Sequence, residues 1–254
     1  MKSIALLLAL SLPVIAPAWA AEAPAKPAAK PAAKAPAQLP DVAAPKMGTN
    51  GQPQAGFIRA HENFVKIAQK GDTGLLFLGD SITAGWAGQK TIWSNAFGIY
   101  KPANFGIGGD RTQHVLWRIT NGELDVHKPK TVVLMIGTNN SGSDESEGTA
   151  RGVTKIVETI RAKLPDAKIL LLAIFPRGAT PQNNPGRAKN DKVNAIIAKL
   201  HDGQKVHYLD IGAKFLQPDG TLTKDIMPDL LHLSAKGYQI WADAMTPKLA
   251  ELMK

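Results

Sequence analysis

The sequence predicts an α/β domain, in which helices cover both faces of a parallel β-sheet. One observation is a set of uncharged, aliphatic-rich runs at residues 75–79, 131–136 and 169–174. Runs of this length, apolar on both faces, are typical of strands buried within a parallel sheet. A second observation is that apolar residues recur at helical spacing between the runs. Strand and helix thus alternate about five times, which is the pattern of an α/β fold.

The other elements follow from the same two patterns. Shorter apolar runs predict two further strands, at residues 103–106 and 206–210. Apolar side chains three and four positions apart predict helices over residues 57–68, 153–164, 193–200 and 238–252. Pro247 is expected to kink the last helix, because proline removes a backbone N–H from the helix interior.

The first 20 residues have the pattern of a secretory signal peptide. Lys2 precedes an apolar run over residues 4–16, and the small residues Ala18 and Ala20 occupy the positions of a cleavage site. The run is shorter than the about 20 residues that a membrane-spanning helix needs. We therefore expect cleavage after Ala20, an exported (periplasmic or secreted) protein and no transmembrane span after removal of the signal. Retention of residues 1–20 as an anchor is the alternative.

The next segment, residues 21–46, consists almost entirely of Ala, Pro and Lys and is predicted to be a flexible linker. Its lysines are either solvated or in contact with an anionic polymer of the cell envelope. Residues 47–254 have the length of one domain. The formal net charge of +9 is spread along the chain without basic and aromatic clusters, which argues against nucleic-acid binding. The chain has no cysteine, which excludes a thiol enzyme or a Cys-ligated metal site.

Polar or glycine-rich clusters follow the predicted strands and precede the last helix. In parallel sheets, active-site and ligand-binding residues lie at the carboxyl ends of the strands, so these clusters are the candidate site. They are Gly79-Asp80-Ser81, residues 104–110, Gly137-Thr138-Asn139-Asn140 and Asp229-Leu230-Leu231-His232.

The clusters together contain the groups that acyl transfer requires. Ser81 is the candidate nucleophile, and His232 is the candidate base that takes the serine proton. Asp229 lies three residues before His232, so within one helical turn its carboxylate reaches the imidazole and fixes the tautomer. The expected donors of an oxyanion hole are the backbone N–H groups of Ser81 and Gly109 and the side-chain amide of Asn139.

Taken singly, each cluster also has a structural interpretation. Ser81 and Asn139 could be turn residues, and the pair Asp229 and His232 could cap a helix or form a surface ion pair. Asp80 is expected to hold its loop through backbone amides. The glycines of residues 104–110 resemble a dinucleotide fingerprint, but Arg111 occupies the position of the third glycine. We therefore expect no nucleotide cofactor, and the absence of zinc-like ligand spacing predicts no metal.

The blocks FLGDSIT, NFGIGGD, GTNN and DLLHLS resemble those of the SGNH, or GDSL-type, hydrolase superfamily. Residues 104–124 and the following PKTVVLMIGTNN are similar to the catalytic subunits of intracellular platelet-activating-factor acetylhydrolases. The resemblance implies a flavodoxin-like three-layer α/β/α sandwich with a five-stranded parallel sheet. It also implies a cofactor-free triad of Ser81, His232 and Asp229, and the possibility of a homodimer. Many members have Asp at the position of Asn140, although the acetylhydrolase branch has Asn, and the export signal is a second departure.

These observations predict an exported serine esterase that removes small acyl groups, acetyl above all, from an O-acetylated carbohydrate or polysaccharide. An exopolysaccharide O-acetyltransferase would use the same acyl-enzyme at Ser81, with a sugar hydroxyl in place of water. A lipase or phospholipid acyl hydrolase is a further alternative, although no extra apolar lid segment is present. A polysaccharide-binding protein that has lost catalysis is the alternative outside the enzymes.

Overall fold

The computed structural model describes residues 38–126, 128–182 and 184–254, all within one compact unit. The predicted signal peptide lies outside the described residues, as does the predicted linker up to residue 37. Within the described part of the chain, no helix is both long and apolar enough to cross a membrane.

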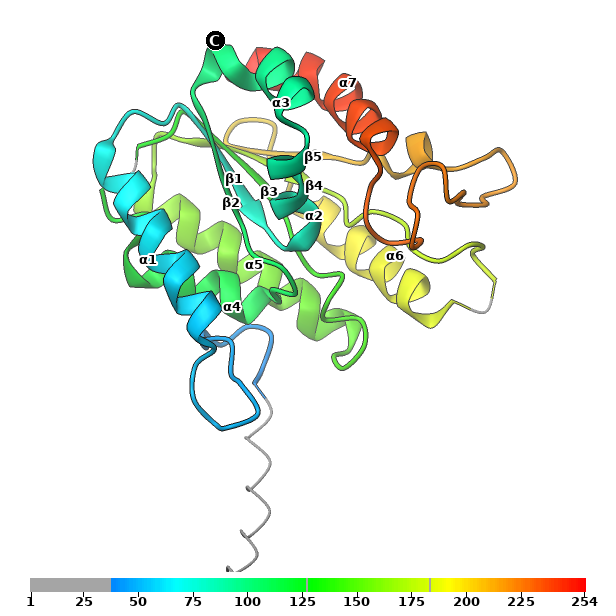
Figure 1. Cartoon of the computed structure of the whole chain (residues 1–254), viewed down its shortest axis with the longest axis horizontal. Helices are drawn as coiled ribbons and strands as arrows, with labels where there is room; N and C mark the ends of the chain where they lie inside the picture. Colours follow the sequence, from blue (N-terminus) through cyan, green and yellow to red (C-terminus); the bar gives the residue numbers. More distant parts are fainter. Residues whose placement is uncertain (1–37, 127, 183) are drawn as a thin grey trace, which may run out of the picture. The chain divides into compact units, whose positions relative to one another are not determined.

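Five parallel strands form one sheet in the order β2-β1-β3-β4-β5 (Figure 1). Each strand lies within one or two residues of the apolar run that predicted it. The bounds are β1 (Leu75–Gly79), β2 (Pro102–Gly106), β3 (Thr131–Met135), β4 (Lys168–Leu172) and β5 (Val206–Leu209). The predicted α/β class with helices on both faces is confirmed.

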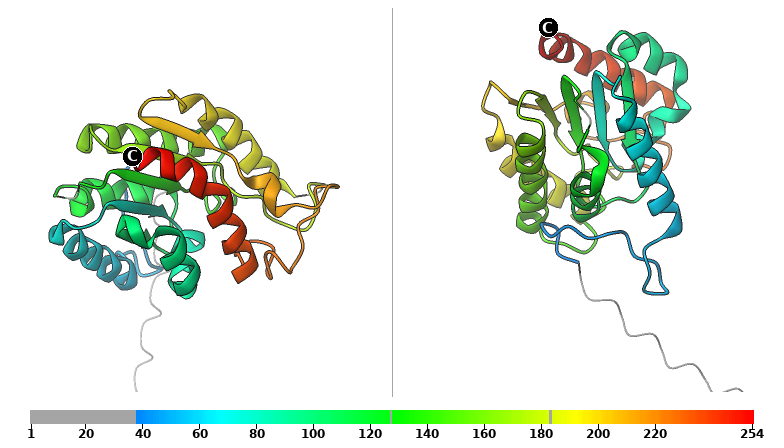
Figure 2. Two further views of the ribbon diagram at one scale, coloured as in Figure 1. Left: turned by 90° about the horizontal axis from the view of Figure 1, so that it is seen from above. Right: turned by 90° about the vertical axis from the view of Figure 1, so that its left-hand side faces the viewer.

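One face of the sheet carries the four helices α1, α4, α5 and α6 (Figure 2). Leu76 and Leu78 point to this face, and Phe105 of β2 stacks there on Phe64 with ring centroids 4.5 Å apart. The helices are α1 (Ala55–Lys70), α4 (Thr112–Arg118), α5 (Ser146–Lys163) and α6 (Pro185–Ile197).

Helices α2 (Ser81–Ala84), α3 (Lys90–Phe97) and α7 (Ala235–Leu252) cover the opposite face. Leu75 and Phe77 point to this side, because successive side chains of a strand alternate between the faces. Aromatic rings fill the contact, and the centroids of Trp86 and Trp241 lie 5.0 Å apart. The Tyr238 hydroxyl of α7 donates to the Ile82 carbonyl oxygen at 2.7 Å, which fixes α2 on α7.

Helix α7 continues to Leu252 with Pro247 in its interior. Short helical turns connect some of these elements. The 3-10 turns are Gly85–Gly88, Gly98–Tyr100, Ala198–Leu200 and Gly212–Phe215, and the turn Ile119–Glu123 is π-helical.

Strands β1, β2 and β3 end at the same level. Gly79, the last residue of β1, pairs with Gly106 of β2 on one side and with Met135 of β3 on the other. The loops after these strands therefore leave the sheet side by side. A Cβ on Gly106 would lie 2.2 Å from the Ala84 backbone nitrogen, so α2 approaches β2 more closely than a side chain permits.

We expect Gly106→Ala to lower the free energy of unfolding by more than about 2 kcal/mol, because the new methyl group overlaps backbone that has nowhere to move. Gly88→Ala is the matched control, since a Cβ at Gly88 meets no atom within 4 Å. Urea denaturation of both variants measures the effect. Equal stabilities of the two variants would contradict the close approach of α2 and β2.

Candidate active site

Ser81 is held at the carboxyl end of β1 by the start of α2. Asp80 forms the N-cap, and its Oδ1 accepts a hydrogen bond from the Ile82 backbone N–H at 2.9 Å. This contact fulfils the bracing role expected for Asp80. Burial raises the pKa of Asp80 to about 7, against the effect of that hydrogen bond. Asp80 thus shapes the loop from the interior, while the partly exposed Ser81 lies at the surface.

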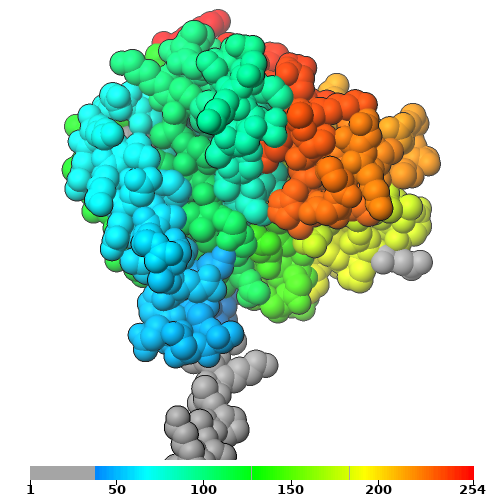
Figure 3. All heavy atoms as spheres, viewed as in Figure 1, coloured from blue at the N-terminus to red at the C-terminus, as the bar shows by residue number. Residues whose placement is uncertain are grey.

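His232 contacts both Ser81 and Asp229. The distance between Ser81 Oγ and His232 Nε2 is 2.8 Å, and the distance between His232 Nδ1 and Asp229 Oδ2 is 2.6 Å. The three predicted residues thus form one continuous hydrogen-bonded chain of hydroxyl, imidazole and carboxylate. Figure 3 shows the corresponding surface, where the orange-red segment before α7 lies against the teal segment after β1.

Asp229 is fixed by its own turn. Its Oδ1 accepts hydrogen bonds from the backbone N–H groups of His232 at 2.7 Å and Leu231 at 3.0 Å. Partial burial raises the pKa of Asp229, but the hydrogen bonds from the His232 side chain and the two backbone groups outweigh it and bring the pKa to about 2. The carboxylate is therefore ionised at neutral pH. Leu230 in this turn has φ of 61°, a left-handed conformation that few non-glycine residues adopt.

The glycine-rich loop after β2 passes beside the serine. A Cβ on Gly108 would lie 4.0 Å from the Ser81 Cβ, and Gly109 has φ of 70°. Asn139, after β3, donates from Nδ2 to the Asp110 carbonyl oxygen at 2.9 Å. Because an amide nitrogen carries two N–H groups, the second N–H of Asn139 remains available. The structure therefore places Ser81 directly after β1 and the other two predicted donors of the oxyanion hole, Gly109 and Asn139, in the two adjoining loops after β2 and β3.

Asn140 joins the same two loops inside the protein. Its Oδ1 accepts from the Thr112 backbone N–H at 3.1 Å, and its Nδ2 donates to Gln113 Oε1 at 3.2 Å and to Asp144 Oδ2 at 3.0 Å. An ionised aspartate could not donate these last two hydrogen bonds. The amide at this position therefore suits the polar groups that surround it.

A buried ion network holds Asp110, at the end of the glycine-rich loop after β2, from the protein interior. Arg118 Nε donates to Asp110 Oδ2 at 3.0 Å, and its Nη1 donates to Glu123 Oε2 at 2.7 Å, with all three side chains fully buried. His61 Nδ1 lies 3.0 Å from Glu123 Oε1. Burial raises the pKa of Asp110 to about 6, although the Arg118 guanidinium opposes this. Breaking such a network is costly, because it leaves an uncompensated charge in the interior.

Lys46 contacts the outside of the glycine loop. Its Nζ donates to the Gly108 carbonyl oxygen and lies 4.0 Å from Asp110 Oδ1. Burial lowers the pKa of Lys46, although Asp110 opposes this. Residues 38–46 fall within the predicted linker, yet they contact α4, where Thr112 Oγ1 donates to the Pro40 carbonyl oxygen at 2.8 Å. No local motif in the sequence points to Lys46, because only the folded chain brings it to Gly108.

Arg177 is a second residue that sequence reasoning missed. It follows the third long apolar run, so an inspection of every strand end would have found it. Its Nη1 donates to the Thr138 carbonyl oxygen at 3.0 Å, next to Asn139. The following residue, Gly178, donates from its backbone to the Leu230 carbonyl oxygen at 2.8 Å. Arg177 therefore lies between the loop of Asn139 and the turn of Asp229 and His232.

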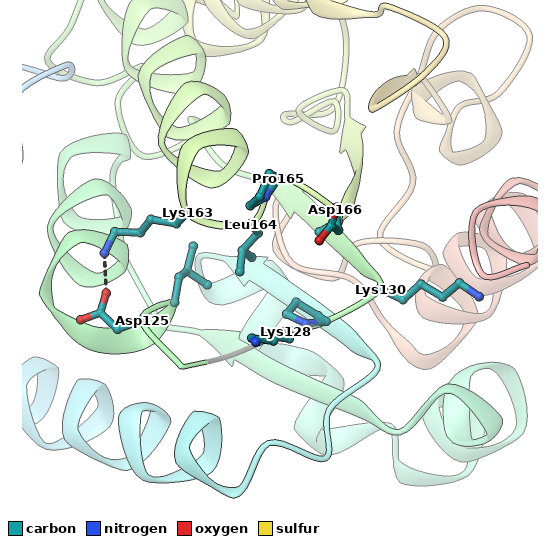
Figure 4. Close-up of a pocket in the computed structure, with 10 residues that line it drawn as sticks. Asp125, Lys128, Lys130, Lys163, Leu164, Pro165 and Asp166 are labelled. Atoms are coloured by element: carbon teal, nitrogen blue, oxygen red, sulfur yellow. Dashed lines mark hydrogen bonds and ion pairs between the residues drawn. The ribbon is translucent and has the colours of Figure 1, made fainter.

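A separate pocket of about 440 Å³ lies at the amino-terminal edge of the sheet, beside the starts of β3 and β4 (Figure 4). Two of its three lysines are engaged within the protein, since Lys163 pairs with Asp125 and Lys130 contacts the carbonyl oxygen of Lys254. None of the predicted site residues lines this pocket. Among the described residues, no group of three or more His, Asp or Glu side chains could hold a metal ion.

Comparison with known proteins agrees with the motifs. The model of the GDSL-like Lipase/Acylhydrolase family matches residues 77–240. Platelet-activating factor acetylhydrolase IB subunit alpha1 of Bos taurus is 38% identical over 203 residues, 80% of this chain and 86% of the relative. The superfamily predicted from the sequence is thus confirmed.

Solved structures with lower identity share the fold. A GDSL-like lipase from Bacteroides thetaiotaomicron has a TM-score of 0.63 at 19% identity, over 78% of this chain and 98% of that one. A carbohydrate acetylesterase from Sinorhizobium meliloti has a TM-score of 0.56 at 18% identity, over 71% of this chain and 99% of that one.

The raised pKa of Asp80 predicts a pH-dependent stability. An aspartate in the unfolded chain loses its proton near pH 4, whereas folded Asp80 keeps its proton up to about pH 7. Folding therefore binds a proton in this window, and the contribution of Asp80 to stability falls as pH rises from 4 to 7. As pH rises from 4 to 7, we expect the free energy of unfolding of Asp80→Asn to increase relative to that of wild type by on the order of 3 kcal/mol.

Urea denaturation at pH 4 and pH 7 measures this difference. The exposed Asp72→Asn is the control, and it should show no comparable change. A difference between wild type and Asp80→Asn that is the same at both pH values would refute the neutral buried state.

Proposed function

Because the chain belongs to the GDSL-like lipase/acylhydrolase family and is a carboxylic ester hydrolase, we propose that it acts through an acyl-enzyme at Ser81. We propose further that it removes small acyl groups, acetyl above all, from O-acetylated carbohydrate or polysaccharide. The observation that carries the serine mechanism is the 2.8 Å contact between Ser81 Oγ and His232 Nε2, with Asp229 on the other imidazole nitrogen.

In the first half-reaction, Ser81 Oγ attacks the ester carbonyl carbon while His232 Nε2 takes the hydroxyl proton. Negative charge develops on the carbonyl oxygen, where the N–H groups of Ser81, Gly109 and Asn139 stabilise it. The tetrahedral intermediate then collapses, His232 returns the proton to the alkoxide, and the alcohol leaves. Asp229 remains ionised and stabilises the imidazolium formed in between.

In the second half-reaction, water attacks the acyl-enzyme. His232 takes a proton from this water, a second tetrahedral intermediate forms in the same set of donors, and its collapse releases the carboxylic acid, which then ionises in water. The proton on His232 returns to Ser81 Oγ. The cycle consumes only ester and water, and the described side chains supply every proton transfer.

Several observations support the choice of acyl group and substrate. The relatives include an acetylhydrolase, and the structural neighbours include a carbohydrate acetylesterase. The side chains of His232 and Asp229 are 44% and 56% exposed, which suits an acyl group presented on a bulky polymer. The signal-like pattern of residues 1–20 favours a substrate outside the cytoplasm. Export is tested by the N-terminal sequence of the protein from the cell envelope, which should begin at Ala21.

Ser81→Ala should lower kcat/KM for a short-chain aryl acetate by about 10⁴-fold, because the nucleophile is lost while substrate binding persists. Ser94→Ala, at an exposed serine of α3, is the control and should retain wild-type activity. The same assay with longer acyl chains should show falling rates for wild type. Equal rates for Ser81→Ala and wild type would refute the mechanism, and a maximum at long chains would favour a lipase.

Lys46 is expected to act through Gly109. The carbonyl oxygen of Gly108 and the N–H of Gly109 belong to one peptide group, so a cation bonded to the oxygen polarises and orients the N–H. We expect Lys46→Met to lower kcat by about tenfold with little change in KM, because the loss falls on the transition state. Lys46→Arg should restore part of the rate. Lys66→Met, at an exposed lysine of α1, is the control.

The pH dependence of kcat distinguishes an effect of the Lys46 charge from an effect of its packing contacts. Because the pKa of Lys46 is lowered, its charge is present at neutral pH and is lost on the alkaline side earlier than that of an ordinary lysine. The ratio of wild-type to Lys46→Met kcat should therefore decline toward one as pH rises. A ratio that stays constant to high pH would contradict the role of the charge.

A further inference from the structure

The Arg177 guanidinium is half-buried beside the active site. Its Nη1 donates to the carbonyl oxygen of Thr138 at 3.0 Å, to Thr138 Oγ1 at 3.2 Å and to Ser141 Oγ at 3.2 Å. Within the described ranges, Nε and Nη2 make no hydrogen bond, and no carboxylate lies within ion-pair distance of the guanidinium. An arginine keeps its positive charge in proteins, so Arg177 is a cation without a counter-ion.

Arg177 lines a pocket of about 550 Å³ that also contains Asn139. The loop of residues 138–142 forms one wall, and the first turn of α6 forms the other. The stem of Arg177 runs along Gly186, where an added Cβ would lie 3.4 Å from Arg177 Cδ and 3.5 Å from Nε. The pocket therefore adjoins the proposed oxyanion hole through Asn139, which both share.

The pocket has one other cation, and it is already engaged. Lys189 Nζ lies 3.4 Å from Glu145 Oε1 and donates to the Asp144 carbonyl oxygen at 2.9 Å. Glu145 thus offsets the charge of Lys189, whereas nothing offsets the charge of Arg177. A partly desolvated cation without a counter-charge costs free energy in the empty site, and an anionic ligand would recover it.

We propose that this pocket binds an anionic group, a carboxylate or a phosphate, carried by the acyl ester, and that Arg177 determines this specificity. The two unbonded nitrogens of the guanidinium match the two oxygens of either anion. The inference rests on the proposed function, because the ester itself must lie at Ser81. An acetylated uronate or sugar phosphate meets the requirement, and a neutral acetylated sugar does not.

Arg177 also has a structural contact, and the test must separate the two roles. Its hydrogen bonds to Thr138 hold the loop of Asn139, so a loss of this support would slow every substrate to a similar extent. A loss of anion binding would slow only charged substrates and would act mainly on KM. The ratio of kcat/KM for a charged substrate to that for its neutral analogue therefore isolates the proposed role.

The experiment measures this ratio at low ionic strength for two matched pairs. One pair is an O-acetylated methyl glucuronoside and its neutral methyl ester, and the other is an acetylated glucose 6-phosphate and the acetylated glucose. The variants are Arg177→Gln, which keeps an N–H donor without the charge, and Arg177→Lys. Arg59→Gln, at an exposed arginine of α1, is the control.

For wild type and Arg59→Gln we expect a preference of about tenfold or more for at least one charged substrate, the size of one charged hydrogen-bonded contact. The pair that shows it identifies the carboxylate or the phosphate as the anion. Arg177→Gln should bring that ratio close to one by raising KM, and Arg177→Lys should retain part of it. A wild-type ratio near one in both pairs, or an equal loss on charged and neutral substrates in Arg177→Gln, would overturn the inference.

The neutral substrates keep this test separate from the proposed function. Hydrolysis of neutral acetates that depends on Ser81 but shows no charge preference would leave the esterase proposal intact and remove the anion pocket. Hydrolysis that persists in Ser81→Ala would instead remove the esterase mechanism itself.

Discussion

The common register of β1 with both of its neighbours is the constraint on which the site depends. Gly79 ends β1 opposite Gly106 of β2 and Met135 of β3, so three loops leave the sheet at one level. Ser81, Gly109 and Asn139 thereby lie in neighbouring loops although they are far apart in the sequence. A shift of one residue in either pairing would turn buried side chains to the wrong face, so the hydrophobic core enforces the alignment of the site.

The fourth component, the turn of Asp229 and His232, reaches this edge by a different route. It precedes α7, and α7 is fixed over α2 by the hydrogen bond from Tyr238 to the Ile82 carbonyl oxygen. The left-handed Leu230 indicates local strain, which the surrounding contacts must offset. Its carbonyl oxygen accepts from Gly178, and the turn is thereby tied to the strand-end segment that carries Arg177.

The sequence predicted the inner strands β1, β3 and β4 because they are apolar on both faces, whereas the edge strands β2 and β5 left only shorter apolar runs. It pointed to Ser81, Asp229 and His232 because each lies within a recognisable block. Helix α4 was not singled out, because Gln113, His114 and Arg118 are buried within it and interrupt the apolar pattern. Lys46 was missed because it belongs to no local motif and reaches Gly108 only in the folded chain. Arg177 does follow a strand end, but its contact with Thr138 also comes only from the fold.

Trapping the acyl-enzyme is the most direct test of whether Ser81 carries the acyl group during turnover. Wild-type protein turning over an aryl acetate is quenched in acid, digested and examined by mass spectrometry. We expect one added acetyl group, located on Ser81 and absent when quenching follows exhaustion of the substrate. Turnover without an acetylated Ser81 peptide, or with an acetyl group that forms and decays at the turnover rate on another residue, would contradict an acyl-enzyme at Ser81.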